Sequence, residues 1–198
     1  NAGGVDGALL RLETEWTDHE YPGYPFALSV ELSYLLTESS FTVEISTHNR
    51  GNIPAPVAFG WHPYFTLGVP VDEVSVQVNA HEFVPVGEDL MPTGAVQSVD
   101  GTSVDFRASR RVGGSAIDLA LVTPAEGAIT LSSSRVNIQL QIPSEPFRYI
   151  QLFTHPNRGS IAVEPVTAAT DAFNRPELGL RVLEPGERLA GAIRVLCT

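Results

Sequence analysis

Short segments in which apolar and polar residues alternate recur along this chain, and this alternation constrains its fold more than any other feature. Residues 28–34 and 41–45 both show it, and a period of two is typical of a strand with one buried face. The turn-forming residues 37–40 lie between them and predict an antiparallel hairpin. Apolar spacings of three and four never persist for the roughly 10 to 12 residues that a helix needs. We therefore expect an all-β protein.

Further strands are expected at both ends of the chain and in its middle. Alternation or a short apolar run predicts them near residues 10–16, 74–78, 83–86, 129–131, 136–142, 150–152, 161–163 and 192–196. We expect the first of these to be half-buried. Segment 87–114 is rich in Gly, Pro and Asp-Gly, which favours loops. No repeat or linker divides the chain, so the prediction is a large antiparallel β-sandwich forming a single domain over residues 1–198.

Composition and charge limit the possible partners. The chain has 43% hydrophobic and 18% charged residues and no apolar run near the roughly 20 residues of a membrane span. Its net charge is −11, and all 12 basic residues are arginine. This balance disfavours nucleic acid, acidic membrane surfaces and highly phosphorylated substrates, and suits a neutral ligand better. With no secretory signal visible at its start, we expect a cytoplasmic protein with no membrane partner.

Motifs for cofactor chemistry are not found in the sequence. The chain has no glycine-rich phosphate loop followed by lysine, no paired histidines at metal spacing and no Gly-x-Ser-x-Gly turn. Its single cysteine, Cys197, can form neither an internal disulfide nor a metal cluster. We expect no cofactor and no metal.

His62 is the first candidate for chemistry, in the aromatic segment Gly60-Trp61-His62-Pro63-Tyr64-Phe65. Pro63 pushes the preceding residue towards an extended conformation, which would hold the imidazole in one direction, as a proton donor requires. The alternative is a histidine that caps an aromatic cluster. His155-Pro156 repeats the dipeptide in a turn-like composition, where we expect a solvent-facing loop residue.

Two carboxylates are further candidates. Glu164 ends the expected strand 160–164 on the face opposite Ile161 and Val163, so it points either into a cleft or into water. Asp118 follows Gly113-Gly114, where close backbone approach and a carboxylate could bind ligand hydroxyls; the alternative is an ordinary loop aspartate. We interpret Asp171 as a loop residue.

Taken in order, several motifs resemble the aldose 1-epimerase (mutarotase) family. They are Tyr24-Pro25-Phe26, the segment from Asn49 through Pro56 to Phe65, Gly113-Gly114 with Ile117-Asp118, Ala162-Val163-Glu164-Pro165 with Asp171-Ala172-Phe173-Asn174, and Leu183-Glu184-Pro185-Gly186-Glu187. Each motif alone is weak, but their order and spacing run the length of the chain.

The resemblance implies roles for individual residues and a type of substrate. It implies His62 as general acid, Glu164 as general base and Asp118 as a ligand of sugar hydroxyls, in a galactose mutarotase-like supersandwich with an open carbohydrate cleft. The expected activity is the interconversion of the α and β anomers of a neutral aldohexose, a monosaccharide, by general acid and base ring opening. Trp61, Tyr64 and Phe65 are candidate platforms for a sugar face, although core packing is at least as strong an alternative in such a cluster.

The chain departs from the family pattern at its beginning. Family members usually start with strands that carry an arginine and a second histidine followed by glycine, whereas His19 here is followed by Glu20. We therefore expect an N-terminally incomplete domain, resembling the last two-thirds of the family's. The segment could have been removed, could come from another chain, or could be lost in an inactive relative. Unpaired strand edges would favour a homo-oligomer or association with that segment.

Two other functions remain open from the sequence. One is a carbohydrate-binding β-sandwich without turnover, which the departure at the N-terminus favours. The other is a hexose-6-phosphate 1-epimerase, for which Arg110-Arg111 is the only adjacent basic pair. A phosphate site requires clustered cations, so the neutral-sugar interpretation ranks higher.

Overall fold

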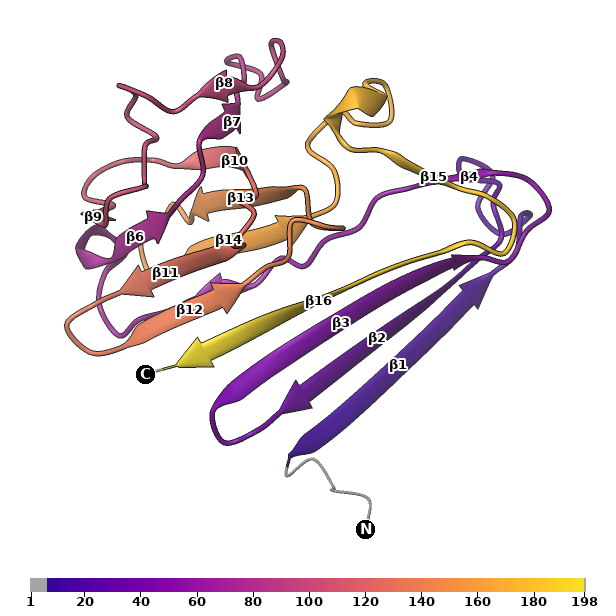
Figure 1. The fold of residues 1–198 in the computed structure, drawn as a ribbon, viewed down its shortest axis with the longest axis horizontal. Coiled ribbons are helices and arrows are strands. Elements are labelled where there is room, and N and C mark those ends of the chain that lie inside the picture. Colours follow the sequence, from indigo (N-terminus) through magenta and orange to yellow (C-terminus); the bar gives the residue numbers. More distant parts are fainter. Residues whose placement is uncertain (1–6, 198) are drawn as a thin grey trace.

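A computed structural model describes residues 7–197 of the chain. They form two large antiparallel sheets, a third sheet of two strands, and two short 3-10 helices, η1 (Val71–Glu73) and η2 (Pro176–Leu178) (Figure 1). The predicted all-β class and the two packed sheets are therefore confirmed.

The larger sheet has eight strands. In spatial order they are β1 (Ala8–Trp16), β2 (Leu28–Leu36), β3 (Ser40–Asn49), β16 (Arg188–Cys197), β12 (Asn137–Gln141), β11 (Ala128–Ser132), β6 (Ser75–Val78) and β9 (Arg110–Arg111). Strands β2 and β3 form the predicted hairpin, in which the Thr37 N–H donates to the Ser40 carbonyl at 2.8 Å.

The second sheet has six strands and carries the candidate residues. Its order is β5 (Tyr64–Phe65), β14 (Ile161–Val166), β13 (Tyr149–Thr154), β10 (Asp118–Val122), β7 (Glu82–Val84) and β8 (Gln97–Ser98). The two-stranded sheet pairs β15 (Arg181–Leu183) with β4 (Ala55–Val57), and the turn after β15 is the predicted one at residues 183–187.

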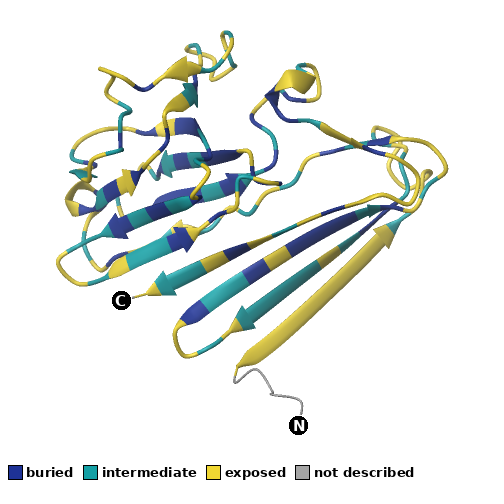
Figure 2. Ribbon diagram, in the orientation of Figure 1, coloured by how far each residue is buried: buried dark blue, intermediate teal, exposed yellow. Residues whose placement is uncertain are grey.

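The main core lies between the two large sheets (Figure 2). Val43, Leu131 and Leu140 of the eight-stranded sheet belong to the same buried cluster as Leu152 and Val163 of the six-stranded sheet. Because side chains alternate along a strand, this burial directs the neighbouring residues of β13 and β14 to the outer face of the six-stranded sheet. The candidate site lies on that outer face.

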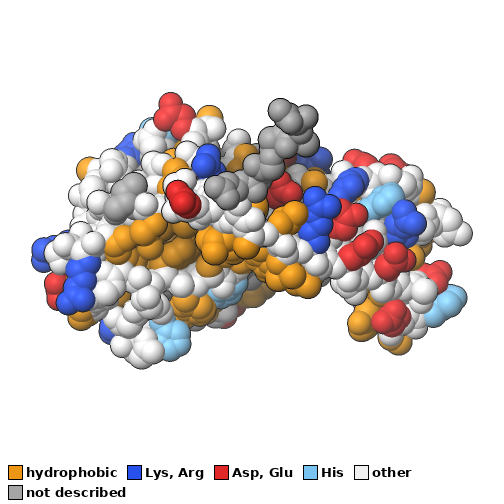
Figure 3. All heavy atoms as spheres, turned by 90° about the horizontal axis from the view of Figure 1, so that it is seen from below, with side chains coloured by type: hydrophobic (Ala, Val, Ile, Leu, Met, Phe, Trp, Pro, Cys, Tyr) orange, Lys and Arg blue, Asp and Glu red, His pale blue; other side chains and the backbone are white. Residues whose placement is uncertain are grey.

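The prediction of a half-buried first strand is wrong. β1 is exposed along almost its whole length, and the side chains of Leu10 and Leu12 are 53% and 50% exposed. β1 pairs with β2 only, and the six-stranded sheet lies over the other end of the large sheet, so nothing in the described part of the chain covers these leucines (Figure 1). Figure 3, which views this side, shows an apolar band beside charged side chains.

The loop alternative for Asp118 and, at two short strands, the loop prediction for segment 87–114 need correction. Asp118 is the first residue of β10, and segment 87–114 contains β8 and β9, each of two residues. β4, β5 and β15 were not predicted either. All except β10 are two or three residues long, too short for a period of two to be visible. No helix in the described part of the chain is long and apolar enough to cross a membrane.

Candidate active site

The segment before β5 runs antiparallel to β14 and places His62 opposite Glu164. Gly60 forms a bridge with Val166, and Tyr64 pairs with Ala162, so the position midway between them pairs with Glu164. Two backbone hydrogen bonds hold this arrangement: Trp61 N–H to the Pro165 carbonyl at 3.1 Å, and Val163 N–H to the Pro63 carbonyl at 3.4 Å. The result is a distance of 3.2 Å between His62 Nε2 and Glu164 Oε1.

Alternation along this segment separates the aromatic residues into two groups. Trp61 packs on the core side, with its ring centroid 6.1 Å from that of Phe41 and 6.4 Å from that of Phe65. Tyr64 lies on the other side, with its ring centroid 5.0 Å from that of His62. The structure therefore brings Tyr64 to the site but not Trp61, for which core packing was the alternative.

Glu164 is sheltered, whereas His62 is open to solvent. The Glu164 side chain is 13% exposed and the His62 side chain 54%. Burial raises the pKa of the Glu164 carboxyl, the charge of His62 opposes that rise, and the negative charge of Asp118 adds to it. A carboxylate with a raised pKa binds a proton more readily than an ordinary glutamate, as a general base must.

Gln151 lies between Glu164 and Asp118 on the outer face of the sheet. It lies on β13 directly opposite Glu164, and its Nε2 donates to Asp118 Oδ1 at 2.5 Å. Sequence reasoning did not single out Gln151. The sequence does contain a signal for it. Gln151 is the polar residue between Ile150 and Leu152, which are buried in the core, so alternation places it on the outer face.

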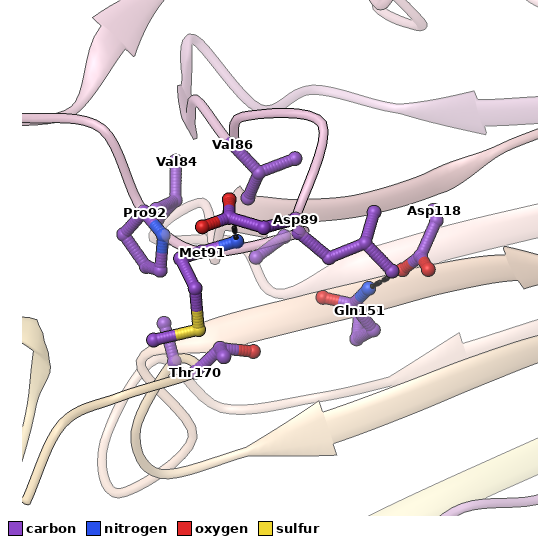
Figure 4. Close-up of a pocket in the computed structure, with 11 residues that line it drawn as sticks. Val84, Val86, Asp89, Met91, Pro92, Asp118, Gln151 and Thr170 are labelled. Carbon is purple, nitrogen blue, oxygen red and sulfur yellow. Dashed lines mark hydrogen bonds between the residues drawn. The ribbon is translucent and has the colours of Figure 1, made fainter.

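A pocket of about 290 Å³ opens beside this pair (Figure 4). Asp118 and Gln151 lie at one end of it, and Val84, Met91 and Pro92 form its far wall. Among residues 7–197, no three His, Cys, Asp or Glu side chains gather closely enough to hold a metal ion.

His155 and Asp171 lie in turns next to the site. His155 follows β13 in the predicted loop but is not fully solvent-facing: it is half-buried, with its ring centroid 5.8 Å from that of Tyr64 in an edge-on contact. Asp171 is a turn residue, as predicted; its φ is 65°, and its Oδ1 accepts a hydrogen bond from Asn174 Nδ2 at 2.6 Å.

The sequence matches the aldose 1-epimerase family over residues 5–195, almost the entire chain. The chain belongs to the aldose 1-epimerase family. The family resemblance of its motifs is thereby confirmed.

Two relatives show how much of a longer protein the chain matches in sequence. YihR of Escherichia coli K12, described as uncharacterized, is 29% identical over 170 residues, which are 83% of this chain and 54% of YihR. Galactose mutarotase of Bos taurus is 36% identical over 89 residues, 43% of this chain and 25% of that protein. The chain thus spans about half the length of YihR and a smaller part of the mutarotase.

Solved structures of the family share the fold. Galactose 1-epimerase from Lactobacillus acidophilus aligns with a TM-score of 0.83 at 19% identity, covering 100% of this chain and 64% of that one. A GalM/aldose epimerase homologue from C. elegans has the same TM-score and identity, covering 96% and 65%. At this identity the likeness concerns the fold, and it confirms the mutarotase-like sandwich.

Proposed function

We propose that this chain is an aldose 1-epimerase that interconverts the α and β anomers of a neutral aldohexose. The observation that carries the proposal is the 3.2 Å separation of His62 Nε2 and Glu164 Oε1 on the outer face of the sheet. Gln151, which pairs with Glu164, lines the neighbouring pocket. An acid and a base this close can act on the two oxygen atoms bonded to one carbon, as anomer exchange requires.

The reaction needs one proton to leave and one to arrive. Glu164 takes the proton of the anomeric hydroxyl while His62, as imidazolium, protonates the ring oxygen, so the bond between that oxygen and C1 breaks and an open-chain aldehyde forms. Rotation about the C1–C2 bond presents the other carbonyl face. Reclosure with the roles reversed returns both protons and gives the other anomer.

The surroundings of the two groups suit these roles. Burial favours proton uptake by Glu164, and the exposure of His62 lets it exchange protons with water. General acid and general base catalysis contribute on the order of 10² to 10⁴ each, which is adequate for a reaction that already proceeds in water. Asp118 and Gln151 provide hydrogen-bonding groups for hydroxyls on the same face.

Polarimetry of freshly dissolved α-glucose and α-galactose tests the proposal. We expect the chain to accelerate mutarotation and Glu164→Gln to abolish the acceleration without loss of folding. Glu126→Gln, an exposed glutamate outside the site, is the matched control and should keep the wild-type rate. An undiminished rate in Glu164→Gln would contradict the assignment. Sugar binding by calorimetry with only spontaneous mutarotation would favour the carbohydrate-binding alternative.

A further inference from the structure

The pocket beside Asp118 and Gln151 continues away from the acid–base pair, where its lining is mainly apolar, with Asp89 and Thr170 as the polar residues. It extends over Ala120 of β10 to Val84 of β7, and Met91 and Pro92 of the loop after β7 close it (Figure 4). A sugar that carries only hydroxyl groups would leave this wall without a complementary surface. The apolar side chains of this wall therefore indicate that the substrate carries an apolar group.

Strand pairing fixes the order of these groups across the sheet. Glu164 pairs with Gln151, Gln151 with Ala120, and Ala120 with Val84. His62 lies on the other side of Glu164, next to β5. Neighbouring strands are about 4.8 Å apart, so the apolar wall begins two strand spacings beyond Glu164.

This order sets the orientation of a bound pyranose, if the proposed acid and base roles hold. The ring oxygen lies at His62 and the anomeric hydroxyl at Glu164, so the ring runs from its oxygen through C1 towards β13. C2 is bonded to C1 on the side away from the ring oxygen. The substituent at C2 is therefore the one directed past Gln151 and Asp118 into the pocket.

We propose that the site takes 2-acetamido-2-deoxy aldoses, whose acetamido group enters this pocket. The inference rests on the proposed function and specifies its substrate class. An acetamido group has an N–H donor next to the ring and a methyl group at its far end, the same sequence of polar and apolar that the pocket has.

The contacts available match the two ends of that group, the amide N–H and the methyl group. Asp118 accepts from Gln151 through Oδ1, and among the described residues Oδ2 has no hydrogen-bond donor, so it can accept the amide N–H. The methyl group reaches the wall formed by Val84, Ala120 and Met91. Asp89 and Asp118 also line the pocket, and their negative charges disfavour a phosphate or carboxylate there.

Comparative polarimetry tests the substrate class. Freshly dissolved α-N-acetylglucosamine, α-glucose and α-glucosamine are the three probes. We expect kcat/KM for N-acetylglucosamine to exceed that for glucose by about tenfold or more, the discrimination that one apolar group in a fitted pocket provides. A value for glucose or glucosamine equal to or above that for N-acetylglucosamine would overturn the inference.

Two variants of one exposed loop residue locate the effect in the pocket. Met91→Glu places a charge against the methyl group and should remove most of the preference, about tenfold, whereas the conservative Met91→Leu should retain it. A preference that survives Met91→Glu would show that it arises elsewhere and would contradict the proposal.

Failure of the proposed function gives a different result. If mutarotation of every probe stays at the spontaneous rate, the epimerase assignment fails. Calorimetric binding then decides the pocket by itself: tighter binding of N-acetylglucosamine than of glucose supports it, and equal or weaker binding overturns it.

Discussion

The chain contains the dipeptide His-Pro twice, and the two copies have different surroundings. His62-Pro63 lies beside β14, where strand pairing brings the imidazole to 3.2 Å from Glu164. His155-Pro156 lies in the turn between β13 and β14, with no carboxylate within ion-pair distance of the ring among the described residues. Both imidazoles contact Tyr64, with ring centroids 5.0 and 5.8 Å away, the first tilted against the ring and the second edge-on.

The difference between the copies is one of strand register, not of local sequence. Pro63 keeps its carbonyl bonded to the Val163 N–H, so the first dipeptide is part of the sheet edge. In the second, the His155 ring accepts the Asn157 N–H through Nδ1 and so stabilises its own turn. The same two residues therefore form a site in one place and a turn in the other.

Replacing each histidine by asparagine should give the largest difference in kcat between the two copies of the dipeptide. His62→Asn removes the acid and should lower kcat by about 10² to 10⁴. His155→Asn should change kcat by less than about threefold, because the His155 ring contacts Tyr64 and bonds within its own turn, whereas Glu164 is paired with His62. Polarimetry measures both, with circular dichroism as the folding control. Equal losses in the two variants would remove the distinction between the copies.

Replacing each proline by alanine should give a smaller difference in kcat between the two copies. Pro63→Ala frees His62 to leave the extended conformation and should lower kcat by about tenfold or less, with the backbone bond to Val163 retained. Pro156→Ala should leave kcat unchanged, since Pro156 is an exposed turn residue. If kcat fell in Pro156→Ala but not in Pro63→Ala, the proline that matters for activity would be the one in the turn, and the prediction would be wrong.

The pH profile should respond to the carboxylate that neighbours Glu164. Glu164 acts as base only when ionised, and burial raises its pKa, so kcat/KM should fall on the acid side at a pH above the usual range of glutamate. Asp118 adds to the rise, so Asp118→Asn should shift this acid limb to lower pH. His155→Asn should not change the pH at which kcat/KM falls on the acid side. A limb that does not move in Asp118→Asn would contradict the assignment of Glu164 as base.

Stability should show the smallest effect. Because the pKa of Glu164 is raised on folding, the folded state holds its proton more tightly, and stability falls as pH rises from the unfolded to the folded pKa. Glu164→Gln removes this penalty and should raise Tm at pH 8, on the order of 2 °C, but not at acid pH. Glu126→Gln is the control. A lower Tm for Glu164→Gln at pH 8 would mean that the ion pair with His62 outweighs burial.

The long alternating strands could be predicted from sequence, and the short ones could not. β2, β3 and β12 alternate over enough residues for a period of two to be visible. β10 begins with Asp118 and continues with three buried residues, so a charged residue after glycines was interpreted as part of a loop. β1 shows that alternation predicts which residues share a face but not whether anything covers that face.

The candidate residues could be named from sequence, but their arrangement could not. His62 and Glu164 lie about a hundred positions apart in the sequence, and only the pairing of residues 60–65 with β14 makes them neighbours. Gln151 was overlooked because one glutamine in an apolar strand has no chemistry of its own. Its position between a carboxylate pair follows from the pairing of three strands.

The pairing of residues 60–65 with β14 also sets a limit on changes of chain length. Deleting one residue between Gly60 and His62 would shift every following side chain to the opposite face. The imidazole of His62 would then take the core-facing place of Trp61, and Pro63 would stand opposite Glu164, so one deletion would damage packing and chemistry together. Insertions are better tolerated in the exposed turn at residues 155–159, where the chain can lengthen without changing the frame of either strand.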